Sequence, residues 1–266
     1  MTYKILFLDI DGTILKPDHT YETTTKNAIK QVKDQGIEVF LATGRPLHEV
    51  EKLARDLEIS SYIGYNGAFA VYQNETIINE PIINEPMRRK SVEEFLQISE
   101  ELQHDMVLYS RDKNYFTSLE KEVVQKFIET FQLVKNDTYH DGVSSDILGA
   151  TVINVSEGQA QNYEIEPDIR LSPVNVDGAQ NSYDIIRNQV NKGEAVKKLL
   201  DRLEIPREKA IAFGDGMNDK EMLMAVGEGF AMSDGHPDLV QYAKHQTTAV
   251  TDSGIYNGLR KLGLVK

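Results

Sequence analysis

The sequence contains no cysteine, and this absence excludes several kinds of chemistry. Without a thiol the chain forms no disulfide, no thiolate zinc site and no iron–sulfur cluster, and it has no cysteine nucleophile. Because a protein without disulfides suits a reducing compartment, we expect a cytoplasmic location.

Long apolar runs are also missing. The segment before Asp9 carries only a short apolar stretch, with neither the length nor the cleavage site of a signal peptide. No run approaches the ~18 apolar residues that a membrane-spanning helix needs. We therefore expect no membrane partner.

Positive charge is scarce, because 29 Lys and Arg residues stand against 42 Asp and Glu residues, for a formal net charge of −13. Such a chain repels the phosphate backbone of nucleic acids, and no basic stripe offsets this, so we expect no nucleic-acid partner. An anionic small substrate would need local cations, which points to a lysine and a metal ion at its binding site.

Motifs of several common enzyme classes are absent too. The sequence has no Walker-type phosphate loop and no Gly-x-Ser-x-Gly elbow. Gly227 and Gly229 lack the third glycine of a dinucleotide fingerprint, because Met232 stands in its place. The six histidines are scattered without the spacing of metal ligands.

Both ends of the chain are predicted to alternate strands with helices. The expected elements are strands at 4–10, 38–43, 62–65, 210–214 and 229–232, and helices at 22–35, 46–57, 193–203, 220–225, 237–243 and 255–262. This alternation predicts an α/β fold, with a Rossmann-like core whose parallel sheet is covered by helices on both faces.

The middle of the chain has a different pattern. After a small hairpin of 68–72 and 76–79, we expect helices at 85–101 and 120–131, and strands at 106–110, 114–118, 150–156, 169–174 and 182–187. Such mixed helices and paired strands predict an α+β domain over residues 82–187, inserted between core segments 1–81 and 188–266. A chain of 266 residues is long enough for both.

Polar clusters follow the predicted core strands at the edge where α/β sheets bind ligands. The first is Asp9-Ile10-Asp11-Gly12-Thr13, whose two carboxylates could hold Mg²⁺ or attack phosphorus. The second holds Thr43 and Gly44, where a hydroxyl and backbone N–H groups suit a phosphate oxygen. Each cluster also has a plainer interpretation: the first could be a polar strand end, and Thr43 of the second could be a helix N-cap.

Two further clusters lie near the C-terminus. Lys192 begins a predicted helix and could serve as a point charge for a phosphoryl group, although most lysines are simply solvated. Gly214-Asp215-Gly216-Met217-Asn218-Asp219 follows a strand, and its acids favour a metal site over an ordinary acidic helix start. Together the four clusters contain what phosphoryl transfer needs: nucleophile, metal ligands, cation and hydrogen-bond donors.

These four clusters resemble the four motifs of the haloacid dehalogenase (HAD) superfamily phosphatases. The chain is most similar to the Cof-type sugar-phosphatase-like hydrolases, which carry a C2-type cap domain between the second and third motifs. Further matches are Tyr65-Asn66-Gly67-Ala68, Glu221-Met222-Leu223, Phe230-Ala231-Met232 and Asp252-Ser253-Gly254-Ile255. Met232 is followed by Ser233-Asp234-Gly235, where the family pattern leads us to expect Asn-Ala. The resemblance covers the core nearly end to end and is weakest through the predicted insertion.

The resemblance implies a Mg²⁺-dependent phosphatase that works through an aspartyl-phosphate. Asp9 would be the nucleophile and Asp11 the general acid and then base, with Lys192 and Asp219 completing the catalytic set. The implied metal residues are Asp9, Asp11 through its main-chain carbonyl, Asp215 and Asp219, the last of which would also orient Lys192 and metal-bound water. The implied phosphate-binding residues are Ile10, Thr43, Gly44, Lys192 and Asn218.

The cap of this family closes over the site and sets specificity. Residues near its entrance or at its predicted strand ends are candidate substrate contacts, namely Arg45, Asn66, Tyr109, Arg111, Tyr183 and Asp184. The implied partner is a small phosphorylated metabolite, such as a sugar phosphate, flavin mononucleotide or pyridoxal phosphate. A phosphomutase and a non-catalytic sensor of phosphorylated metabolites stay open as alternatives. The sequence does not determine the oligomeric state, for which a monomer is our expectation.

Overall fold

A computed structural model describes residues 2–72, 83–143, 146–174, 176 and 178–266. The chain divides into two compact units. The first unit comprises Met1–Gly44, Lys52–Ile83 and Asn191–Lys266, and the second comprises Arg45–Glu51 and Asn84–Val190.

The first unit contains an eight-stranded sheet among the described residues. In sheet order its strands are β14 (His245–Gln246), β13 (Glu228–Ala231), β12 (Ala210–Gly214), β1 (Ile5–Leu8), β2 (Glu38–Ala42), β3 (Ser61–Gly64), β4 (Phe69–Val71) and β5 (Ile83–Asn84). The strands from β14 to β3 pair in parallel, and β4 runs antiparallel to β3. All four residues of β1 are buried, as expected for a central strand covered on both faces.

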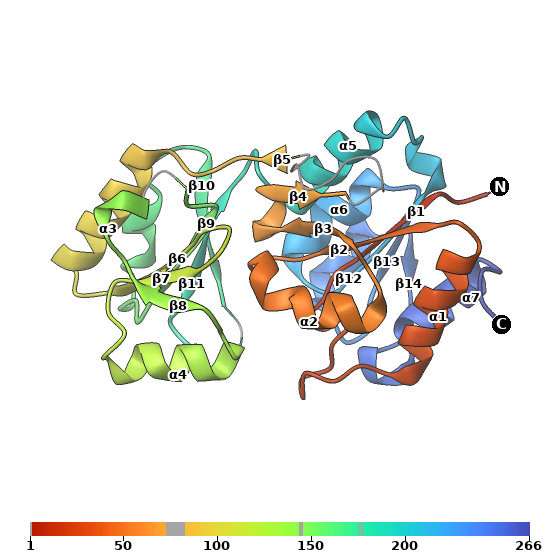
Figure 1. Ribbon diagram of the computed structural model, residues 1–266, viewed down its shortest axis with the longest axis horizontal. Coiled ribbons are helices and arrows are strands. Elements are labelled where there is room, and N and C mark those ends of the chain that lie inside the picture. The colour runs from red at the N-terminus through yellow and green to blue at the C-terminus, as the bar shows by residue number, and fades with distance from the viewer. Residues whose placement is uncertain (1, 73–82, 144–145, 175, 177) are drawn as a thin grey trace. The chain divides into compact units, whose positions relative to one another are not determined.

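Helices cover both faces of this sheet (Figure 1). They are α1 (Thr23–Asp34), α2 (Leu47–Leu57), α5 (Lys192–Arg202), α6 (Lys220–Ala225) and α7 (Gly254–Lys261). On one face, Phe7 and Phe40 of the strands pack with Leu199 of α5 and Met222 of α6. On the other, α7 lies against Phe213 of β12 and beside α1. The predicted α/β core with helices on both faces is confirmed.

The second unit contains a six-stranded sheet among its described residues. In sheet order its strands are β10 (Ile169–Pro173), β11 (Tyr183–Arg187), β9 (Gly149–Ile153), β6 (Asp105–Tyr109), β7 (Asn114–Phe116) and β8 (Asn136–Thr138). One apolar cluster joins α3 (Arg89–Glu101) to Met106 and Leu108. Another joins α4 (Glu122–Phe131) to Val107 and Phe116. Because successive residues of β6 alternate between the clusters, the two helices cover opposite faces.

Several element boundaries differ from the sequence-based expectations. Helix α3 begins at Arg89 rather than at residue 85: Pro86 disfavours helical backbone at residue 85, and Arg88 keeps an extended backbone as the N-cap. The segment 237–242 forms a 3₁₀ helix. The edge strands β8 and β14 are additional to the expected strands, since both are short and polar and carry no apolar pattern. Strand β4 pairs with β3, and the second strand of the predicted hairpin lies outside the described residues.

The described helices are all either too short or too polar to span a membrane.

Helices α5 and α6 approach one another closely at Gly193. A Cβ atom at this position would lie 2.4 Å from the backbone carbon of Glu221, where no side chain fits. We expect Gly193→Ala to lower the free energy of unfolding by about 1–3 kcal/mol, because the clash outweighs the better helix propensity of alanine. Urea unfolding followed by circular dichroism measures this.

Gly149→Ala is the matched control for the same chemical change. A Cβ at Gly149 meets its nearest neighbour, Cδ2 of Tyr109, at an ordinary contact distance of 3.6 Å. Its free energy of unfolding should stay within about 0.5 kcal/mol of wild type. Equal losses in both variants would contradict the proposed clash between α5 and α6.

Candidate active site

The candidate site residues of the first unit lie where adjacent strands end. Asp9 directly follows β1, Thr43 follows β2 and Asp215 follows β12, and these three strands are neighbours in the order β12-β1-β2. The backbone N–H of Asp9 also donates to the carbonyl of Phe213 at 3.1 Å, which extends the β1–β12 pairing to the site. Parallel pairing therefore brings three polar groups to one edge of the sheet.

A buried lysine lies between two of the carboxylates. Lys192 is fully buried, and its Nζ donates to Oδ1 of Asp9 at 2.6 Å and to Oδ1 of Asp219 at 2.7 Å. Asn191 fixes the start of α5, because its Oδ1 accepts a hydrogen bond from the backbone of Glu194 at 2.9 Å. The N-cap thus places Lys192 as the first residue of a helix beside the end of β1.

Asp219 connects this lysine to the loop after β12. While Oδ1 accepts from Lys192, Oδ2 accepts from the backbone N–H groups of Asp215 at 3.0 Å and Gly216 at 3.1 Å. Both oxygens of this fully buried side chain are therefore engaged by the protein itself. This arrangement suits a residue that orients Lys192 and the loop more than one that binds a metal directly.

Asp215 is held by the turn that follows β1. The hydroxyl of Thr13 donates to Asp215 Oδ1 at 3.0 Å. Gly12, with φ of +82°, passes so close that a Cβ there would lie 2.3 Å from Asp215 Oδ2. Both the left-handed backbone and the close approach require glycine. Thr13 was part of the quoted motif, but the sequence did not reveal its contact with Asp215.

The charge in this cluster is unbalanced. Carboxylate oxygens of Asp9, Asp215 and Asp219 lie within 4.8 Å of one another. Among the ion pairs of the described residues, the ammonium of Lys192 is the one cation in this cluster, and it pairs with Asp9 and Asp219. Burial, with repulsion from Asp219, raises the pKa of Asp215 to about 7 and raises that of Asp9 as well. Burial opposes the charged form of Lys192, but Asp219 and Asp9 outweigh it and hold its pKa above the usual range.

A divalent cation fits this cluster. Hard cations such as Mg²⁺ prefer a few carboxylate oxygens, and a double positive charge would offset the excess negative charge. The side chains of Asp9 and Asp215 have the right chemistry for such an ion, as does the exposed Asp11 on the turn after β1.

A second group of predicted residues lies together near Thr43. The backbone N–H of Asn66 donates to the carbonyl of Thr43 at 3.1 Å, and its Oδ1 accepts from Asn218 Nδ2 at 3.2 Å. The Asn66 amide also lies so close to Gly44 that a Cβ at this position would be 3.0 Å from Asn66 Oδ1. Tyr65 and Asn66 both adopt a φ of +53°, a conformation that non-glycine residues rarely adopt.

Ile10, a predicted phosphate contact, is fully buried, and its carbonyl accepts hydrogen bonds from the backbone N–H groups of Ile14 and Leu15.

The remaining predicted substrate contacts lie in the second unit. Thr151 donates to Asp184 Oδ1 at 2.6 Å, and its oxygen lies 2.9 Å from the hydroxyl of Tyr109. Since Thr151 has one proton and gives it to a carboxylate, Tyr109 must donate to Thr151. Burial raises the pKa of both Tyr109 and Asp184.

Tyr183 and Asp184 do not share a face of their strand. Tyr183 packs into the apolar cluster on the α3 side, whereas its neighbour Asp184 faces the other side of the sheet. Each therefore stays a separate predicted substrate contact, on its own face of the sheet. Arg45 belongs to the second unit and acts electrostatically on Tyr109, and Arg111 lies in the exposed turn between β6 and β7.

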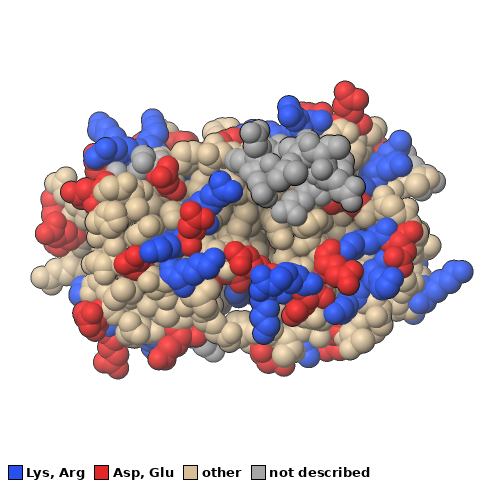
Figure 2. Space-filling view, in the orientation of Figure 1, with Lys and Arg blue, Asp and Glu red and all other residues tan. Residues whose placement is uncertain are grey.

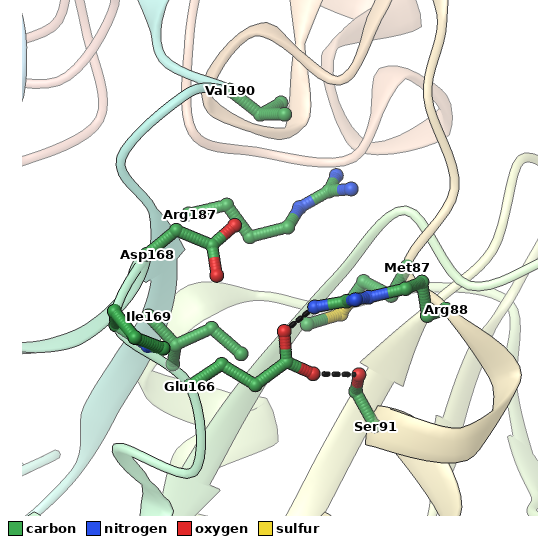
Figure 3. Close-up of a pocket in the computed structure, with 9 residues that line it drawn as sticks. Met87, Arg88, Ser91, Glu166, Asp168, Ile169, Arg187 and Val190 are labelled. Atoms are coloured by element: carbon green, nitrogen blue, oxygen red, sulfur yellow. Dashed lines mark hydrogen bonds and ion pairs between the residues drawn. The ribbon is translucent and has the colours of Figure 1, made fainter.

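A separate cavity of about 510 Å³ lies within the second unit (Figure 3). Glu166 accepts from Ser91 Oγ at 2.7 Å and forms an ion pair with Arg88. Arg187 Nη2 donates to the carbonyl of Glu85 at 2.7 Å. The residues that line this cavity include none of the predicted site residues, and its main charged groups are engaged by the protein.

Surface charge is mixed on the described part of the face in Figure 2. Lys and Arg side chains alternate there with Asp and Glu side chains rather than forming a uniform basic stripe.

Comparison with known proteins identifies the family. The sequence pattern of the haloacid dehalogenase-like hydrolases matches residues 6–259, so the chain belongs to this family. The predicted family is confirmed, and with it the prediction of an enzyme of the hydrolase class.

Two curated relatives and one solved structure match nearly the whole chain. The Bacillus subtilis (strain 168) protein named "Putative phosphatase YkrA" is 29% identical, with 100% of each chain covered. The 5-amino-6-(5-phospho-D-ribitylamino)uracil phosphatase YitU of the same organism is 28% identical, covering 97% of this chain and 96% of the relative. The crystal structure of a hypothetical protein from Geobacillus kaustophilus HTA426 has a TM-score of 0.86 and 26% identity, covering 99% of this chain and 100% of that one.

The charge imbalance predicts that Mg²⁺ stabilises the folded protein. At a hundredfold excess over Kd, binding contributes about 2.7 kcal/mol, which should raise Tm by roughly 5–10 °C. Thermal unfolding of EDTA-treated protein, with and without added MgCl₂, measures the rise. Asp215→Asn should abolish it, because the variant loses a carboxylate that faces the cluster.

Asp34→Asn is the matched control for this experiment. Its side chain is 63% exposed and pairs with Lys30 on α1, away from the candidate site. The Tm rise with Mg²⁺ should be the same as in wild type. A rise that survives in Asp215→Asn would contradict metal binding at this cluster.

Proposed function

We propose that the protein is a Mg²⁺-dependent phosphatase that hydrolyses small phosphorylated metabolites through a phosphoryl group carried on Asp9. The observation that carries this proposal is the buried contact of Asp9 with Lys192, beside Asp215 and Asp219 at the carboxyl edge of the sheet. The names of the curated relatives YkrA and YitU, both phosphatases, support it.

Lys192 and Asp219 prepare the site for an anion. The ammonium of Lys192 holds one oxygen of Asp9 and leaves the other to attack phosphorus. Asp219 keeps Lys192 in place, because the opposite end of its carboxylate is anchored to two backbone N–H groups. Thr43, the backbone of Gly44, and Asn218 would bind the phosphoryl oxygens, since the Asn66 contacts gather these residues in one place. The buried Ile10 stays a predicted phosphate contact through its backbone.

The reaction we propose has two balanced steps. An oxygen of Asp9 bonds to phosphorus as the ester P–O bond breaks, and the leaving oxygen takes a proton from Asp11. Water then attacks phosphorus, gives a proton back to Asp11 and breaks the bond to Asp9, which releases inorganic phosphate. The exposed position of Asp11 on the turn after β1 suits exchange of protons with substrate and water.

Mg²⁺ bound by Asp9, Asp215 and the main-chain carbonyl of Asp11 would supply positive charge that offsets the charge of the phosphoryl group. The ammonium of Lys192 is not enough to offset the charge of the phosphoryl group, because it is already shared between Asp9 and Asp219.

For the substrate we propose a phosphate ester of a polyol or sugar. The named substrate of YitU carries a phosphorylated ribityl chain, which supports this choice. We further propose that residues 82–187 form the cap that sets specificity. There the carboxylate of Asp184, with one oxygen held by Thr151, is a suitable acceptor for a hydroxyl. The other predicted substrate contacts stay candidates, namely Arg45, Asn66, Tyr109, Arg111 and Tyr183.

The test is release of inorganic phosphate from a panel of sugar and polyol phosphates. Wild type should release phosphate with Mg²⁺ and not with EDTA. Asp9→Asn should lower kcat by at least about 10³-fold, because an amide cannot act as the nucleophile. Asp18→Asn, whose side chain is 63% exposed, should retain wild-type activity.

Other outcomes separate the alternatives. Transfer of phosphate to a second sugar without release of free phosphate would indicate a mutase. Tight binding of one compound without turnover would indicate a sensor. Full activity in Asp9→Asn would contradict the proposed nucleophile.

A further inference from the structure

The boundary between the compact units passes through the segment that follows the phosphate-binding residues. Thr43 and Gly44 belong to the first unit, whereas the next seven residues, Arg45–Glu51, belong to the second. Helix α2, Leu47–Leu57, returns to the first unit from Lys52 onward. The position of Gly44 therefore depends directly on whatever holds Arg45–Glu51.

A buried carboxylate holds this segment in the second unit. The side chain of Glu49 is only 3% exposed, and its Oε1 accepts a short hydrogen bond of 2.5 Å from Nδ2 of Asn114 on β7. The backbone N–H of Val134 donates to Oε1 at 3.0 Å and to Oε2 at 3.1 Å. A buried charge is tolerated only when its oxygens are satisfied in this way.

Asn114 is the centre of the network. It is fully buried, and the two N–H bonds of Nδ2 are shared among three acceptors: Glu49 Oε1, the carbonyl of Val134 at 3.0 Å and Oδ1 of Asn136 at 3.0 Å. These acceptors fix the orientation of the amide, so its Oδ1 faces Nε2 of His48 at 3.0 Å and must accept from it. His48 is also buried, and its Nδ1 lies 3.4 Å from the carbonyl of Arg111.

We propose that Glu49 is a positioning residue, which through Asn114 and Val134 fixes the segment Arg45–Glu51 and so restrains the adjoining backbone of Thr43 and Gly44. This inference rests on the proposed function for its effect on catalysis. Fixing Arg45–Glu51 restricts the backbone of Gly44 one peptide bond away and so keeps the loop ready for a phosphoryl group. A fixed loop does not have to be ordered when substrate binds, which lowers the cost of binding.

An exposed ion pair on the same segment offers a matched control. Lys135 Nζ lies 3.4 Å from Glu51 Oε1, and the two side chains are 48% and 53% exposed. Because water and salt screen such a pair, it adds little to the attachment of the segment.

Two measurements test the proposal on the full-length protein. Hydrogen–deuterium exchange of residues 43–51 reports the attachment without any need for activity. Steady-state kinetics, with Mg²⁺ and the best sugar or polyol phosphate of the panel, report its effect on the reaction. In Glu49→Ala we expect at least about tenfold faster exchange in this segment and a KM raised about tenfold, with kcat changed by less than about twofold.

Conservative and control variants keep the test specific. Glu49→Gln should restore both values to within about twofold of wild type, because one amide oxygen can accept from Asn114 and Val134. Lys135→Ala should match wild type. If Glu49→Ala does not fold, Asn114→Ser serves instead, since it removes the amide donor and leaves the Val134 N–H on Glu49.

Each outcome decides one part of the proposal. Unchanged exchange at 43–51 in the variant would overturn the attachment. Faster exchange with an unchanged KM would overturn its role in positioning. If wild type releases no phosphate from any compound, the proposed function fails, and the exchange result still decides whether the attachment exists.

Discussion

The structure of the site depends on one buried ammonium between two carboxylates. Lys192 is fully buried and lies within 2.7 Å of oxygens from both Asp9 and Asp219, which come from opposite ends of the chain. Removing one member of such a buried group leaves an uncompensated charge in the interior, which strongly destabilises the fold. The three side chains therefore stabilise the fold only as a set. The cluster is short of positive charge, because Asp215 adds a third carboxylate and no ion pair among the described residues brings it an ammonium.

The fold supplies the geometry that this cluster needs. Neighbouring parallel strands end at one edge, so Asp9, Thr43 and Asp215 meet there although more than 200 positions separate the first from the last. Close backbone approaches then bring the loops into contact: Gly12 lies against the Asp215 side chain, and Gly193 lets α5 approach α6. Local sequence, sheet topology and site chemistry are therefore consistent with one another.

Much of this arrangement could be predicted from the sequence, because its signals are local. The apolar runs that end at Asp9 and Asp215 indicate strands and the edge where they end. By contrast, Glu49 and Asn114 are 65 positions apart and carry no periodic signal, so their contact emerges only from the fold. Tyr183 and Asp184 are neighbours on a predicted strand, so the strand period already puts them on opposite faces, but which face each one takes emerges only from the pairing register.

Asp9 is the side chain that we propose carries the phosphoryl group during the reaction. The most direct measurement is rapid acid quenching during turnover of a sugar or polyol phosphate with Mg²⁺, followed by mass spectrometry of the peptide that contains Asp9 and Asp11. We expect a phosphoryl adduct on Asp9 that appears during turnover and disappears when substrate is exhausted. An adduct on another residue, or turnover at the same rate in a variant that cannot form one at Asp9, would contradict it.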